Sequence, residues 1–142
     1  MTTRYALYTT AELKNLSQIR DFVEMAATGL GFEPEVIPNV QLAVDEVATN
    51  VMLHGYHGQG GPLEIELERL EHDLIVHLRD EAAPFDPTTV PTPDLTLPLA
   101  KRPIGGLGVH LVRRTMDEIR HQITSTGGNE LTLVKHGVGG ES

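Results

Sequence analysis

Two polar side chains on one stretch of the sequence, Glu46 and Asn50, could do chemistry together. They lie four residues apart within residues 42–56, where apolar residues recur at helical spacing, so both side chains fall on one face of a helix. An amide oxygen suits one position on Mg²⁺, and a carboxylate one turn away could accept a proton from a hydroxyl or a water. Because both residues border the apolar stripe, the pair either caps a structural network or lines a site.

A second candidate is Asp80, which opens the segment DEAAPFDP directly after a predicted strand. A carboxylate at a strand end could accept a hydrogen bond from an exocyclic amine. Aspartate is also common in turns that bind nothing, so this position alone leaves both interpretations open.

A third candidate is the glycine-rich start of a predicted helix, at Gly105, Gly106 and Gly108. Glycines let the backbone approach a ligand, and the free N–H groups of a helix start favour an anion. A flexible loop that meets a helix would look the same. Lys101 and Arg102 precede these glycines and could either reach phosphates or be ordinary surface charge.

Two further patterns have simpler explanations. His54 and His57 have the HxxH spacing of metal ligands, but no acidic third ligand accompanies them, so we expect them to end the helix and border the site. The segment Gly127-Gly128-Asn129 predicts a tight turn before a strand that carries Thr132.

The elements that must position these groups follow from the apolar periodicity. We predict helices over 10–28 and 39–53 and another helix after the glycines at 105–108. On the second helix, one apolar stripe has on it or beside it Leu42, Ala43, Val47, Val51 and the nearby Val40 and Val44. Alternating residues predict strands over 4–9, 63–67, 74–79, 119–124 and 131–134. A proline-rich segment, about 81–105, reads as a lid, and residues 137–142 as a flexible tail.

This order predicts an α+β fold, a two-layer sandwich with a mixed, mainly antiparallel sheet and helices on one face. The doubly wound alternative needs a regular strand–helix alternation that the sequence lacks. The 142 residues fit one domain.

The composition excludes several functional classes. With no cysteine, the chain offers no disulfide, thiolate zinc site or thiol nucleophile. A net charge of −9 argues against broad binding to nucleic acid or to an anionic membrane. The absence of a signal peptide pattern or a membrane-spanning stretch predicts a cytoplasmic location.

Taken in order, these motifs resemble the boxes of the GHKL (histidine-kinase-like) ATPase superfamily, whose domains have the Bergerat fold. The stretches LAVDEVATNVMLHGY, RDEAAPFDP and IGGLGVHLVRRTMDEI resemble the bacterial anti-sigma-factor serine/threonine kinases of the RsbW type. The resemblance covers nearly the whole chain.

The resemblance implies ATP and Mg²⁺ as ligands and assigns a role to each candidate. Asn50 would bind Mg²⁺, Glu46 would be the general base toward a serine hydroxyl, and Asp80 would bind the adenine amine. The phosphates would lie against Gly106, Leu107, Gly108 and Val109, with Lys101 and Arg102 in the lid, and Thr132 would support the adenine end. At Ala82 the family usually has glycine, so the methyl group could crowd the nucleotide.

The resemblance also implies partners. The protein substrate would be a STAS-domain antagonist, and its phosphorylation would regulate a sigma factor, and so transcription, by partner switching. Such proteins are typically homodimers. The alternative, suggested by Ala82 and the unusual lid, is a nucleotide-sensing binding module with little or no kinase activity.

Overall fold

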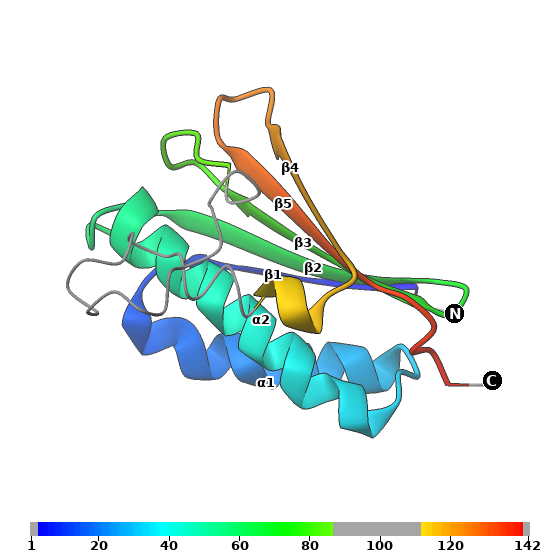
Figure 1. Ribbon diagram of the computed structural model, residues 1–142. Coiled ribbons are helices and arrows are strands. Elements are labelled where there is room, and N and C mark those ends of the chain that lie inside the picture. Colours follow the sequence, from blue (N-terminus) through cyan, green and yellow to red (C-terminus); the bar gives the residue numbers. More distant parts are fainter. Residues whose placement is uncertain (1–2, 87–111, 141–142) are drawn as a thin grey trace, which may run out of the picture.

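The computed structural model describes residues 3–86 and 112–140, and in this part of the chain the fold has two layers (Figure 1). One layer is a five-stranded sheet in the order β1-β2-β3-β5-β4, and all its neighbouring strands are antiparallel. The strands are β1 (Arg4–Thr10), β2 (Pro62–Leu70), β3 (Asp73–Asp80), β4 (Glu118–Ile123) and β5 (Asn129–Lys135). The predicted α+β sandwich is confirmed, with an antiparallel rather than a mixed sheet.

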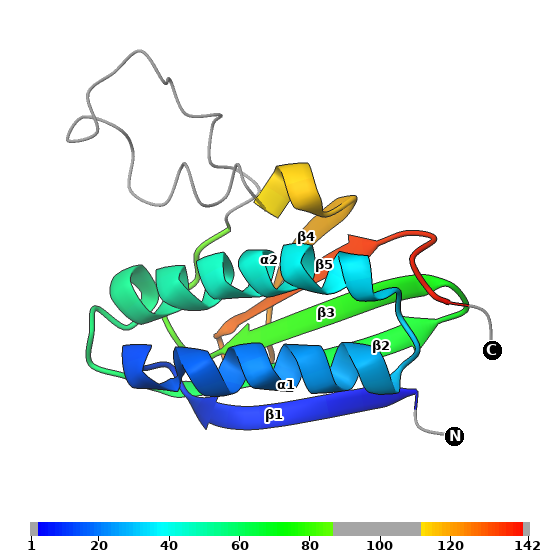
Figure 2. The ribbon, with the colours of Figure 1, turned by 90° about the horizontal axis from the view of Figure 1, so that it is seen from below.

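The second layer consists of helices that cover one face of the sheet. Figure 2 shows α1 (Leu16–Gly29) beside β1 and β2, with α2 (Ile37–Asn50) farther toward β5 and β4. Short turns extend both helices: η1 (Leu13–Asn15) precedes α1, η2 (Pro34–Val36) precedes α2, and the π-helical turn η3 (Val51–Gly55) follows it. Residues 112–115 form a further helical turn before β4.

The sheet forms because its strands alternate apolar and polar residues. Leu63, Ile65 and Leu67 of β2 are at most 2% exposed and face the helices, whereas the glutamates between them face away. The register places Ile65 opposite Leu78 and Leu67 opposite Val76, so apolar residues meet across the sheet. This alternation decides which residues of each strand can reach a site on the helix side of the sheet.

The helices are amphipathic, and their apolar stripes complete the core. The buried residues of α2 are Ile37, Val40, Ala43, Val44 and Ala48. Leu42, expected on or beside this stripe, is 40% exposed, because at 3.6 residues per turn it lies on the side opposite Val40 and Val44. The prediction is wrong for this residue, while the stripe itself is confirmed. No helix in the described ranges is both long enough and apolar enough for a membrane crossing.

The predicted flexible tail at 137–142 is wrong for the residues that the structure describes up to 140. Gly139 forms a β-bridge with Phe32, and the Gly140 N–H donates to the Gly31 carbonyl at 2.8 Å. Arg69 Nη2 donates to the Gly140 carbonyl at 2.6 Å, and its guanidinium lies 5.5 Å from the centre of the Phe32 ring. Long-range hydrogen bonds therefore hold a segment whose composition alone suggested fraying.

Candidate functional site

A cavity of about 300 Å³ lies between the end of α2, the end of β3 and the start of β5. Its walls are mostly apolar, and a few polar groups reach it. The lining residues are Val47, Asn50, Val51, His54, Gly55, Leu78, Asp80, Ala82, Ala83, Pro84, Phe85, Val112, Ile119, His121, Asn129 and Leu131. An apolar cleft with a few convergent polar groups is the usual form of a small-molecule site.

Asp80 is the buried charge of this cavity. It ends β3 and is 6% exposed, and its Oδ1 accepts hydrogen bonds from the Ala82 N–H and from Asn129 Nδ2, both at 2.9 Å. Burial raises the pKa of Asp80 above its ordinary value, and the two hydrogen bonds act in the opposite direction. The carboxyl is thus a fixed polar group inside an apolar wall, at the end of a strand.

The backbone beside Asp80 is crowded on its other side. Asp80 and Asn129 are paired residues of β3 and β5, and Gly128 precedes Asn129. A Cβ at Gly128 would lie 2.1 Å from the carbonyl oxygen of Asp80, closer than real contacts allow. Glycine is therefore required at this position to bring β5 against the end of β3.

Of the predicted pair Glu46 and Asn50 on α2, only Asn50 lines the cavity. Asn50 lines the cavity at the end of α2, together with His54 one turn later in η3. Glu46 lies one turn before Asn50 and is half-buried, but it is not among the lining residues. The π-helical turn is of interest because such insertions are frequent at functional sites. His54 borders the site as predicted, whereas His57 lies outside the lining.

Ala82 lines the cavity and is 6% exposed. Its methyl group has space because Gly55 lies opposite: a Cβ built on Gly55 would be 3.0 Å from Ala82 Cβ. The cavity is therefore present with the alanine in its wall.

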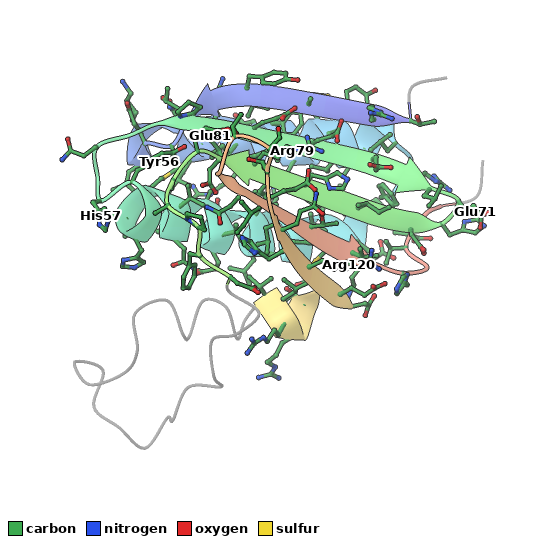
Figure 3. The ribbon with its side chains drawn as sticks, turned by 90° about the horizontal axis from the view of Figure 1, so that it is seen from above. Tyr56, His57, Glu71, Arg79, Glu81 and Arg120 are labelled. Atoms are coloured by element: carbon green, nitrogen blue, oxygen red, sulfur yellow. The ribbon has the colours of Figure 1, made fainter. Side chains whose placement is uncertain are left out.

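Tyr56 links the segment after α2 to the sheet through hydrogen bonds of its hydroxyl. Its hydroxyl donates to the Pro62 carbonyl at 2.7 Å and accepts the Glu81 N–H at 2.6 Å, and Figure 3 shows both labelled side chains at this end of the molecule. The Tyr56 ring occupies the space beside Gly61, where a Cβ would lie 2.4 Å from a ring carbon. The segment after α2 and the segment after β3 are thereby fixed to one another.

Thr132 does not lie in the cavity, so its predicted role at the adenine end is wrong in placement. Side chains of a strand alternate, and Leu131 and Leu133 face the helices. Thr132 therefore faces the opposite side of the sheet, where its hydroxyl lies 3.0 Å from His77 Nδ1. The residues of β5 that line the cavity are Asn129 and Leu131.

The face of the sheet that carries Thr132 is a network of ion pairs (Figure 3). Arg79 lies at its centre and contacts Glu64, Glu66 and Glu130 at 3.2, 3.2 and 2.5 Å. His77 Nε2 lies 2.9 Å from Glu68 Oε2. These charges satisfy one another on the face away from the cavity and have no part in the candidate site.

Several predicted residues lie outside the described ranges, namely Lys101, Arg102, Gly106, Leu107, Gly108 and Val109. The expected lid, about 81–105, is described only as far as residue 86. In that part Ala82, Ala83, Pro84 and Phe85 line the cavity, and Val112 lines it from the other flank of the undescribed segment.

Two polar cavity residues were missed by the sequence analysis, Asn129 and His121. Asn129 was assigned to a turn, and His121 lay in a strand without any motif. His121 Nε2 is 2.7 Å from Asn129 Oδ1, so the two side chains form one polar group with Asp80. The signal that could have found them is the strand alternation, which places residues 119, 121, 129 and 131 on the helix side.

Comparisons with known proteins agree with this fold. Residues 9–135 match the family described as "Histidine kinase-like ATPase domain". The serine/threonine-protein kinase BtrW of Bordetella bronchiseptica is 30% identical over 96 residues, 67% of each chain. The serine-protein kinase RsbW of Bacillus cereus is 27% identical over 130 residues, 89% of this chain and 80% of the relative.

A solved structure supports the fold independently. The crystal structure of the RsbU and RsbW domains of Rv1364c from Mycobacterium tuberculosis matches 94% of this chain, with a TM-score of 0.65 and 14% identity. This chain corresponds to 32% of that longer one. The fold is that of the histidine-kinase-like ATPases. The chain belongs to this family, and its resemblance to the RsbW-type kinases is confirmed.

Proposed function

We propose that this protein is an ATP-dependent protein serine/threonine kinase of the anti-sigma-factor type. The observation that carries the proposal is the Asp80 carboxyl, 6% exposed at the end of an apolar cavity that Asn50 also lines. A flat heteroaromatic base fits such a cavity, and a fixed carboxylate suits an exocyclic amine. The name of the relatives, serine-protein kinase, supports the same activity.

The residues present fit ATP and Mg²⁺ as follows. Asp80 would hold the amine of the adenine, and the apolar walls would exclude water from the base. Asn50 would supply one oxygen to Mg²⁺, which takes its other ligands from phosphates and water. Glu46 would accept the proton of the substrate serine hydroxyl. The serine oxygen would then take the γ-phosphoryl group of ATP, and ADP would leave.

The protein substrate that we propose is a STAS-domain antagonist, and its phosphorylation state would decide whether this protein holds a sigma factor. We further propose a homodimer as the working unit. Both proposals come from the resemblance to RsbW-type kinases. Sedimentation of the protein alone and with a co-encoded STAS protein would test them.

Thermal unfolding with and without Mg-ATP tests the nucleotide site directly. A ligand at a hundred times its dissociation constant adds about 2.7 kcal/mol to stability, which raises the midpoint of a chain this size by several degrees. Asn50→Ala should lose the part of the shift that depends on Mg²⁺, and a chelator should remove the same part from the wild type. No shift at millimolar Mg-ATP would contradict the proposal.

A second experiment separates the kinase from a nucleotide-sensing binding module. That alternative is favoured by one observation: Glu46 does not line the cavity. Transfer of labelled phosphate to a STAS protein, lost in Glu46→Gln while ATP still raises the unfolding midpoint, would support the kinase. Tight binding of the STAS protein and of ATP without transfer would support the module.

A further inference from the structure

The side chain of Asn129 joins three segments at the edge of the cavity. It is 7% exposed, and its Nδ2 donates to Asp80 Oδ1 at 2.9 Å. Its Oδ1 accepts the Phe85 N–H at 2.9 Å and lies 2.7 Å from His121 Nε2. The Nδ2 also lies 3.3 Å and 3.2 Å from the carbonyl oxygens of Ala82 and Ala83.

The orientation of this amide follows from its neighbours. A backbone N–H can only donate, so the Asn129 atom that faces Phe85 must be the oxygen. The nitrogen therefore faces Asp80 and the two carbonyls, all of which accept. Since His121 Nε2 also faces the Asn129 oxygen, that ring nitrogen must carry a proton. Each group at this junction thus has a defined donor or acceptor role.

These roles decide what Asp80 presents to a ligand. Its Oδ1 already accepts two N–H groups, from Ala82 and Asn129. Among the described residues no hydrogen bond to Oδ2 is formed, so this oxygen is the acceptor that is left for a ligand. A carboxylate fixed in this way accepts from an amine, and it repels a carbonyl oxygen in the same place.

We propose that Asn129, held by His121, is a positioning residue that fixes Asp80 for the amine of a purine base and anchors residues 82–85 to β5. It would thereby set the preference of the cavity for an amine-bearing base. The proposal rests on the proposed nucleotide-binding function. Neither residue transfers a group, since both act through the carboxylate and the segment that they hold.

The test compares dissociation constants for ATP and for inosine triphosphate, which has a carbonyl oxygen in place of the amine. We expect the wild-type chain to prefer ATP. Asn129→Leu should weaken ATP binding about ten- to a hundredfold, the effect of one hydrogen bond to a charged group, and should bring the ratio of the two constants toward one. Asn15→Leu is the matched control, because Asn15 donates to Thr10 far from the cavity, and it should keep the wild-type ratio.

A second pair of variants serves if Asn129→Leu fails to fold. His121→Gln retains an N–H that can reach the Asn129 oxygen, whereas His121→Leu removes the donor. We expect His121→Leu to lose preference for ATP and His121→Gln to retain most of it. A folded Asn129→Leu, or His121→Leu, with the wild-type ratio would overturn the proposal while leaving nucleotide binding intact. A wild-type chain that binds neither nucleotide would overturn the proposed function itself.

Discussion

Gly55 and Ala82 face each other in the wall of the cavity, so closely that a Cβ on Gly55 would lie 3.0 Å from the Cβ of Ala82. A methyl group on both residues would force one of them to shift by a few tenths of an ångström, so the glycine leaves room for the alanine methyl group. The pair explains how alanine can stand at a position where the resemblance led us to expect glycine. It also shows that the π-helical turn η3, which ends at Gly55, and the segment after β3 are packed as one unit.

This relationship predicts compensation between the two sites. Gly55→Ala should destabilise the chain by about 1–3 kcal/mol and weaken Mg-ATP binding, because two methyl groups compete for one space. The double variant Gly55→Ala with Ala82→Gly moves the methyl group across the wall and should recover most of both losses. Denaturant unfolding and ATP titration of all four chains measure the coupling. Strictly additive effects would show that the two residues do not share this space.

The Tyr56 hydroxyl gives a second prediction. Tyr56→Phe leaves the Glu81 N–H and the Pro62 carbonyl without their partner, which should lower the free energy of unfolding by about 1–3 kcal/mol. Tyr8→Phe is the control, because Tyr8 is 76% exposed and its change should stay within about 0.5 kcal/mol. Urea unfolding at neutral pH compares the two variants. Equal effects would show that the hydrogen bonds of the Tyr56 hydroxyl do not stabilise the fold as we expect.

His136 predicts a pH dependence of stability. The imidazole lies between Asp73 Oδ2 at 3.0 Å and Glu118 Oε2 at 2.6 Å, and these hydrogen bonds raise the pKa of His136 above its ordinary value. The stabilisation is therefore complete below the ordinary histidine pKa, about 6.5, and is lost as the pH rises through the raised value.

His136→Gln should remove this loss of stability above about pH 6.5. His57→Asn is a suitable control, since His57 is exposed and has a φ of 53°, which asparagine tolerates. Urea unfolding as a function of pH measures both. The hypothesis fails if the wild type and His136→Gln have parallel stability profiles across this range.

Arg69 predicts the behaviour of the C-terminal segment. Its side chain donates to the Leu30, Glu71 and Gly140 carbonyls. Arg69→Met keeps an unbranched side chain but loses these hydrogen bonds. We expect faster hydrogen exchange at Gly139 and Gly140 and a free energy of unfolding lower by about 1–3 kcal/mol. Arg4→Met, on the exposed edge strand, should change neither. If hydrogen exchange at Gly139 and Gly140 is unchanged in Arg69→Met, the Arg69 side chain is not what protects this segment.

The sequence predicts the layers well, because each strand and helix carries its own periodicity. The alternation at 63–67 and the stripe of α2 are local patterns, and the structure confirms them. Asp80 was also found locally, from its place after a strand. What local patterns do not contain is the pairing between distant strands, and the errors concentrate there.

Thr132 and Asn129 illustrate this limit. Both belong to β5, and which of them reaches the cavity depends on the face that β5 turns to the helices. That face is set by the pairing with β3, which places Asn129 beside Asp80 and Thr132 beside His77. The held tail at Gly139 and Gly140 was missed for a related reason, since its partners are Gly31, Phe32 and Arg69, far away along the chain.

The need for glycine at position 128 has a consequence for how this domain can evolve. Only glycine fits beside the Asp80 carbonyl, so the register in which β5 pairs with β3 requires glycine at position 128. A slip of β5 by one residue that set Asn129 against that carbonyl would clash, and a slip in either direction would turn Asn129 to the other side of the sheet. Gly128 should therefore be retained in descendants of this domain for as long as Asn129 lies beside Asp80 in the cavity.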